Sequence, residues 1–152
     1  MRLLGMGMAM LLAGCAPAPA PVAVQKPRPD VTKEAWYGAA VEELAGMNRE
    51  AARLLQSGKK DEAAARITKG LPLEARLLAA PKPTLGAVEA AADLDQMYAE
   101  MLLGNRNYGW ARLEFQKNVS RWKNWKPETA ETARRLQLAL EGIRECDRRI
   151  TE

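Results

Sequence analysis

Apolar residues recur every three or four positions along most of the chain that follows residue 30. In the segment 32–56 they form one stripe, which consists of Trp36, Ala40, Leu44, Met47, Ala51 and Leu54. This spacing places the residues on one face of an α-helix, and no segment shows the every-second-residue alternation of a half-buried β-strand. Together with the abundance of Ala, Leu, Glu, Arg and Met, the pattern predicts an all-α domain.

Breaks in this pattern divide the first half of the domain into three predicted helices. Gly58 ends the first of them, where a left-handed backbone is expected. Asp61 is expected to cap a short second helix that closes at Gly70, and Pro72 suits the first turn of another short helix. The expected architecture is five to six helices, arranged as a small antiparallel bundle or as stacked helical hairpins.

The second half of the domain contains two segments of opposite charge. Residues 84–105 hold four acidic residues and no basic one, with Thr84 as the expected cap of a helix that ends near Leu103. Residues 105–126 hold six basic residues and one acidic residue, Glu114. Two such helices, joined by a short loop, are expected to pack antiparallel and to neutralise each other in part. A last helix is expected to begin at Pro127.

The basic helix carries two different faces on a helical wheel. One is an apolar stripe typical of a core contact, formed by Tyr108, Ala111, Phe115, Val119 and Trp122. Roughly opposite lie Arg106, Trp110, Lys117 and Arg121, with Leu113 beside them and Trp125 at the rim. Trp and Arg are enriched in binding hot spots, so this second face, with Trp125, is the candidate partner-binding site. The alternative is that Trp110 is covered by another part of the chain and that the basic residues only confer solubility.

The amino-terminal residues have the organisation of a signal peptide. Arg2 precedes an apolar stretch of eleven residues, which is too short to span a bilayer. The stretch ends in Leu12-Ala13-Gly14-Cys15. These four residues resemble the lipobox of bacterial lipoproteins, which implies cleavage before Cys15 and its modification with diacylglycerol and an N-acyl chain. The alternative is an ordinary secretory signal with a cysteine by chance.

The resemblance to lipoproteins also implies a location and a domain organisation. Residue 16 is alanine and not the aspartate of the retention signal for the inner membrane, which favours the periplasmic face of the outer membrane. Residues 15–30 contain five of the nine prolines and are expected to be an extended spacer. The predicted organisation is therefore a signal peptide at 1–14, a lipidated spacer at 15–30 and one helical domain at 31–152.

The composition excludes several classes of active site. The chain has no histidine, which excludes serine or cysteine nucleophiles activated by histidine and metal sites that need imidazole. With Cys15 lipidated, Cys146 is the only thiol, so no internal disulfide is expected. Cys146 shares a helical stripe with Ile143, which favours a buried structural cysteine over a free or intermolecular thiol. Acidic catalysis, for example by Glu114 on a glycan, would need a raised pKa and a groove. We expect no enzyme activity, no metal and no cofactor other than the lipid.

Two segments are similar to the centre of a tetratricopeptide repeat. Residues 51–71 have Ala51, Gly58, Ala63 and Ile67 at the offsets of that family, and residues 98–115 look like a looser second copy. The two turn glycines, Gly58 and Gly104, are 46 residues apart, whereas the period of the family is about 34. The resemblance implies stacked helical hairpins that bind other proteins.

These patterns predict an envelope lipoprotein whose helical domain is a protein-binding scaffold or assembly accessory. Its partners would be the membrane, reached through the lipid, and an envelope protein. The alternative is that the basic and tryptophan-bearing face at 106–125 binds peptidoglycan or another anionic envelope polymer. A sequence pI near 9.2 and a basic stripe also fit nucleic acid, but a lipoprotein outside the cytoplasm is not expected to meet it.

Overall fold

The computed structural model describes residues 29–152, which form five α-helices after a short 3-10 helix at Val31–Lys33. The helices are α1 at Ala35–Gln56, α2 at Lys60–Leu78, α3 at Leu85–Gly104, α4 at Tyr108–Asn124 and α5 at Ala130–Thr151. No strand occurs among these residues, and the prediction of an all-α bundle is confirmed. The predicted signal peptide and all but the last two residues of the predicted spacer lie outside the described residues.

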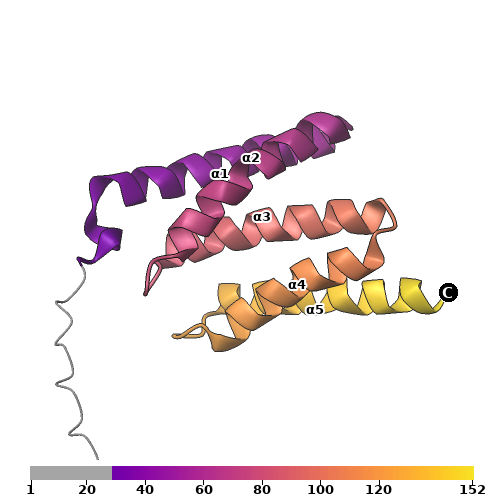
Figure 1. Ribbon diagram of the computed structural model, residues 1–152. Helices are drawn as coiled ribbons and strands as arrows, with labels where there is room; N and C mark the ends of the chain where they lie inside the picture. The colour runs from indigo at the N-terminus through magenta and orange to yellow at the C-terminus, as the bar shows by residue number, and fades with distance from the viewer. Residues whose placement is uncertain (1–28) are drawn as a thin grey trace, which may run out of the picture.

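Successive helices pack against each other in chain order (Figure 1). α1 and α2 form one hairpin, α3 and α4 form a second, and α5 packs on α4. α3 lies in the centre and contacts all four other helices. Its buried positions include Ala87, Ala90, Ala91, Ala92 and Ala99. Because these side chains are small, the neighbouring helices can approach α3 from several directions.

The antiparallel packing of α3 and α4 is confirmed. The side-chain amide of Asn118 donates to the carbonyl oxygen of Ala92 at 2.9 Å. Further along, Ala99 and Ala111 are buried in one cluster with Phe115 and Cys146. Earlier residues of α3 therefore meet later residues of α4, as two antiparallel helices require.

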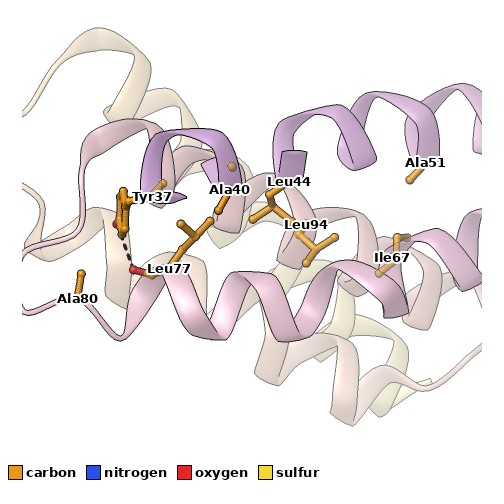
Figure 2. Packing of buried hydrophobic residues seen from close by; sticks show 10 residues of the cluster. Tyr37, Ala40, Leu44, Ala51, Ile67, Leu77, Ala80 and Leu94 are labelled. Atoms are coloured by element: carbon orange, nitrogen blue, oxygen red, sulfur yellow. Dashed lines mark hydrogen bonds between the residues drawn. The ribbon is translucent and has the colours of Figure 1, made fainter. Parts of the chain in front are cut away.

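The largest buried cluster lies between α1, α2 and α3 (Figure 2). It contains Leu44, Leu77 and Leu94, together with the buried ring of Tyr37. The hydroxyl of Tyr37 donates to the carbonyl oxygen of Leu77 at 3.1 Å, so the polar end of this buried ring is satisfied. Trp36, which the apolar stripe includes, is only half-buried, and the guanidinium of Arg76 lies 4.0 Å from the centre of its ring.

The predicted division of residues 60–78 into two short helices is wrong. α2 runs through Gly70 and Pro72 without a break. A Cβ at Gly70 would lie 3.1 Å from a methyl of Leu94 and 3.2 Å from one of Leu44, so glycine here permits close packing and does not end the helix. Pro72 is exposed, as is Thr68 one turn earlier, so solvent can hydrate the backbone carbonyl that proline leaves without a donor.

The observed helix ends agree in part with those predicted from the sequence. Gly58 has a φ of 76°, as expected, and Thr84 caps α3 by accepting from the backbone nitrogen of Ala87 at 3.3 Å. Asp61 lies inside the first turn of α2 and is not its cap. Pro127 lies before α5, whose cap is Thr129, so the predicted start of the last helix is also wrong.

Candidate functional site

Two apolar side chains on α4 project into solvent. Trp110 is 67% exposed and Leu113 is 52% exposed, and the two lie three residues apart on the same helix. By contrast, four of the five residues of the predicted core stripe are buried, whereas Tyr108, at the start of the helix, is only half-buried. The four are Ala111, Phe115, Val119 and Trp122. α4 therefore has one buried face and one exposed apolar pair, and Trp110 is largely exposed, as the wheel predicts.

Arg106 lies close to this exposed pair in the chain but outside the helix. It is exposed in the turn between α3 and α4, where its backbone has a φ of 63°. Non-glycine residues adopt this left-handed conformation infrequently. The wheel treats Arg106 as part of the helical face, and the structure corrects this, because α4 begins only at Tyr108.

The prediction that Arg121 belongs to the exposed face is wrong. Its side chain is only 13% exposed and points between α2 and α3. The guanidinium donates to Oδ2 of Asp95 at 2.9 Å and to the side-chain oxygen of Asn118, and it lies 3.5 Å from Glu74. The wheel gives a direction around α4 alone, whereas the carboxylates of α2 and α3 determine which arginine turns inward.

Lys117 is half-exposed and already paired. Its ammonium group lies 2.5 Å from Glu114 and 3.7 Å from Asp95. Partial burial lowers the pKa of Lys117, but the hydrogen bond to Glu114 and the nearby carboxylates outweigh this and raise it above its ordinary value. Lys117 therefore contributes less free positive charge to the surface than its sequence position predicts.

Trp125 is not available to a partner in the way the sequence predicts. It follows the last residue of α4, and its ring packs edge to face with that of Trp122, with centroids 6.5 Å apart. The ring also joins a cluster that includes Leu78 and Leu136. Trp125 thus helps to close the end of the bundle.

Together, the inward-facing residues form a charged cluster between α2, α3 and α4. It contains three carboxylates, from Glu74, Asp95 and Glu114, and the two cations of Lys117 and Arg121. Burial and the neighbouring charge of Asp95 raise the pKa of Glu74 to about 7, against the opposing effect of Arg121 and Lys117. The sequence showed that α3 and α4 have complementary charge, but it did not show that Asp95 is fully buried or that Glu74 joins it.

Each carboxylate of this cluster is engaged with a cation. Glu74 is engaged with Arg121, and Glu114 with Lys117. Among residues 29–152, no group of three or more acidic, cysteine or histidine side chains is placed to hold a metal ion. The only cysteine of this part of the chain, Cys146, is buried and unpaired, in agreement with the preferred prediction. The cluster is best described as a bridge between helices.

Comparison with known proteins adds no assignment. The chain matches no protein-family model, no curated protein and no solved structure. The resemblances to lipoproteins and to tetratricopeptide repeats therefore stay predictions. Of the helices that the structure describes, none is both long and apolar enough to cross a membrane.

Proposed function

We propose that this protein is a lipid-anchored bacterial envelope protein whose helical domain docks a protein partner through Trp110 and Leu113. The observation that carries the docking proposal is the exposure of these two side chains, one turn apart on α4. Tryptophan is among the residues that contribute most to binding when a partner covers them. The lipid anchor rests on the Leu12–Cys15 motif, which lies outside the described residues.

The anchor and the exposed pair would act together. Two apolar side chains form a small contact, well below the roughly 1,600 Å² of a typical stable interface. A protein held at the membrane by Cys15 meets other envelope proteins at a raised local concentration, which strengthens weak contacts. The proposed mechanism is therefore passive: the lipid brings the domain to the membrane, and Trp110 provides the specific contact.

The distribution of charge favours a protein over an anionic envelope polymer. A polymer such as peptidoglycan would depend on the positive charges of this face. Of the three cations predicted there, Arg121 is mostly buried and Lys117 is ion-paired, which leaves Arg106 as the one that is exposed and forms no ion pair within residues 29–152. The apolar part of the face, in contrast, is exposed, since more than half of the surface of Trp110 and of Leu113 is accessible to solvent.

The anchor is tested by metabolic labelling of cells with radioactive palmitate. We expect the label on the full chain and its loss in Cys15→Ser. Label that persists in Cys15→Ser, or that is absent from the unmodified sequence, would contradict the lipoprotein assignment while leaving the docking proposal open to its own test.

Docking is tested with the full chain, purified in nonionic detergent and crosslinked in solubilised envelope extract at low and at physiological salt. We expect one discrete crosslinked partner, retained at physiological salt and lost in Trp110→Ala. Leu85→Ala is the matched control, since Leu85 is also an exposed apolar residue, 41% exposed, but lies on α3. The partner is then purified and its binding measured with both variants.

A parallel incubation with peptidoglycan sacculi tests the alternative. Retention on sacculi that fades steeply with salt and is weakened by Arg106→Ala would replace protein docking by polymer binding. If Trp110→Ala changes neither the crosslinked partner nor the sacculi fraction, the exposed pair has no binding role.

A further inference from the structure

We infer that the carboxyl groups of Glu74 and Asp95 share one proton, and that the release of this proton loosens the C-terminal half of α2 from α3 and α4. The pair is thus a pH-sensitive switch inside the charged cluster. Neither Trp110 nor Leu113 belongs to this cluster, so the inference does not depend on the proposed function.

The first observation is the position of the two carboxylates. Nη2 of Arg121 lies 2.9 Å from Oδ2 of Asp95 and 3.5 Å from Oε1 of Glu74. Two carboxylates from different helices therefore meet at one nitrogen atom, close enough to share a hydrogen bond with each other. Two like charges at such short range oppose each other's ionisation, and carboxyl groups in contact can hold one proton between them.

The second observation is a buried acceptor without a donor. Asp95 is fully buried, and its Oδ1 forms no hydrogen bond with any residue in 29–152. The ammonium group of Lys117 lies 3.7 Å from this oxygen, which is beyond hydrogen-bond distance. Buried polar atoms are nearly always satisfied in proteins. A proton on the neighbouring carboxyl group of Glu74 would supply the missing donor from within the protein.

The third observation is the identity of the groups that face Glu74. The charged groups that face it are one from α3 and two from α4, namely Asp95, Lys117 and Arg121. Glu114 joins the cluster through its ion pair with Lys117. α1, the other helix that packs on α2, is joined to it by the ion pair of Glu50 with Arg66, about two turns of helix before Glu74.

These groups leave the cluster with an excess of negative charge. Three carboxylates, of which that of Asp95 is fully buried, are opposed by only two cations, and one proton removes the excess. Burial and the charge of Asp95 raise the pKa of Glu74 to about 7, although the two cations oppose this, so the proton is released near neutral pH. Glu74 is 8% exposed, so its proton can exchange with solvent.

The proton controls an electrostatic contact between two helices that do not lie side by side. α2 and α4 are joined by the ion pair of Glu74 with Arg121. While the proton is bound, the cluster is neutral and α2 provides a donor to Asp95 of α3. After its release, an uncompensated charge stays buried, and a local opening that hydrates Glu74 becomes less costly. The closed contact is therefore most stable below about pH 4.5, the ordinary pKa of Glu74, and is weakened as the pH rises through 7.

The proton is measured by infrared difference spectroscopy of the full chain in nonionic detergent, between pH 6.5 and pH 8.5. Ordinary Asp and Glu side chains, with pKa values of about 4, are ionised at both pH values and cancel. We expect the carbonyl stretching band of one protonated carboxylic acid at pH 6.5 and its loss at pH 8.5. The band should be absent from Glu74→Gln and unchanged in the control Glu43→Gln, which replaces an exposed glutamate of α1.

Asp95→Asn separates a shared proton from one that burial alone retains. The variant removes one of three carboxylates, so the two cations balance the cluster without a proton, and we expect the band at pH 6.5 to disappear. In ¹³C spectra of the unmodified chain, the carboxyl carbons of Glu74 and Asp95 should titrate with one common midpoint, which tests the sharing without any substitution. A band that persists unchanged in Asp95→Asn, different midpoints for the two carbons, or the absence of any titrating band would each overturn the inference.

The loosening of α2 is measured by hydrogen exchange and mass spectrometry at pH 5 and pH 8, after correction for the intrinsic pH dependence of exchange. We expect the protection of residues 70–78 to fall about tenfold or more at pH 8, and that of residues 139–146 of α5 to fall much less. Glu74→Gln keeps a neutral donor beside Asp95 and should abolish the fall. An equal fall in both segments, or a fall that persists in Glu74→Gln, would overturn the switch.

Discussion

The guanidinium of Arg121 donates to Oδ2 of Asp95, which is fully buried, across 2.9 Å between the two atoms. Removing one partner of a buried ion pair leaves the other charge without compensation and costs about 3–5 kcal/mol. In Arg121→Met the ammonium group of Lys117, 3.7 Å from Asp95, still compensates part of this charge. We therefore expect the variant to lower the free energy of unfolding by an amount near the lower end of that range, measured by urea unfolding and circular dichroism.

The double variant Arg121→Met with Asp95→Leu provides the control. Replacing both members of a buried pair by apolar residues is often close to neutral. The double variant should therefore recover much of the stability lost in Arg121→Met alone. A single variant that costs less than about 1 kcal/mol would contradict the buried position of this pair.

The titration of Glu74 should lower the free energy of unfolding as the pH rises. Its pKa in the folded protein, about 7, lies above its ordinary value of 4.5, so the folded state holds this proton more tightly than the unfolded state does. The associated stability is fully present below about pH 4.5 and is lost as the pH rises through 7, by an amount on the order of 2–3 kcal/mol.

Glu74→Gln removes this titration and should therefore be more stable than the unmodified protein at pH 8. Thermal unfolding of both proteins at pH 5 and pH 8 measures the difference, and other titrating groups cancel in that comparison. Glu43→Gln, at an exposed position of α1, is the control and should show no such gain. An equal stability difference at both pH values would show that Glu74 keeps its ordinary pKa.

The ring of Phe115 leaves no room for a side chain at position 142, which is glycine. A Cβ at position 142 would lie 2.6 Å from three carbons of that ring, closer than side chains can approach. Gly142→Ala should therefore cost about 1–3 kcal/mol through overpacking between α4 and α5. In Gly38→Ala the new methyl group meets no atom within 4 Å, so this helical substitution should instead stabilise the protein by about 0.5–1 kcal/mol. Urea unfolding distinguishes the opposite signs.

Cys146 should be protected in the folded protein. It is fully buried, and burial raises the pKa of its thiol, which lowers the fraction of reactive thiolate. In a Cys15→Ser background, we expect slow reaction with an aromatic disulfide reagent at pH 8 and rapid reaction in urea. Equal rates in the two conditions would place this thiol at the surface.

The sequence predicts those features of the fold that depend on local periodicity. In the stripe of α4, Ala111, Phe115, Val119 and Trp122 are buried and only Tyr108, at its start, is half-buried. The same three- and four-residue spacing that forms the helix also sets its contact face. The same periodicity shows that Trp110 lies away from that face, and the structure leaves it exposed. The caps at Thr84 and Gly58 are equally local features, and both are confirmed.

Features that depend on neighbouring helices could not be predicted in this way. Arg121 and Trp110 lie close together on the wheel. Arg121 nevertheless turns inward, because it forms ion pairs with Asp95 of α3 and Glu74 of α2. Gly70 looks like a helix end in the sequence, but it is a packing residue because Leu44 and Leu94 approach it closely. The depression that Asn48 lines can be seen only once α1 and α3 have been placed side by side.

The order in which the helices pack has a consequence for how the protein opens. α5 contacts only α4 and, less extensively, α3, and the residues that it fully buries are Thr132, Ala139 and Cys146. α3, by contrast, is held by all four other helices. Local unfolding begins where few contacts must be broken. Amide hydrogen exchange should therefore be fastest among the helices in α5 and slowest in α3, so that the domain frays from the end of the chain farthest in sequence from Cys15.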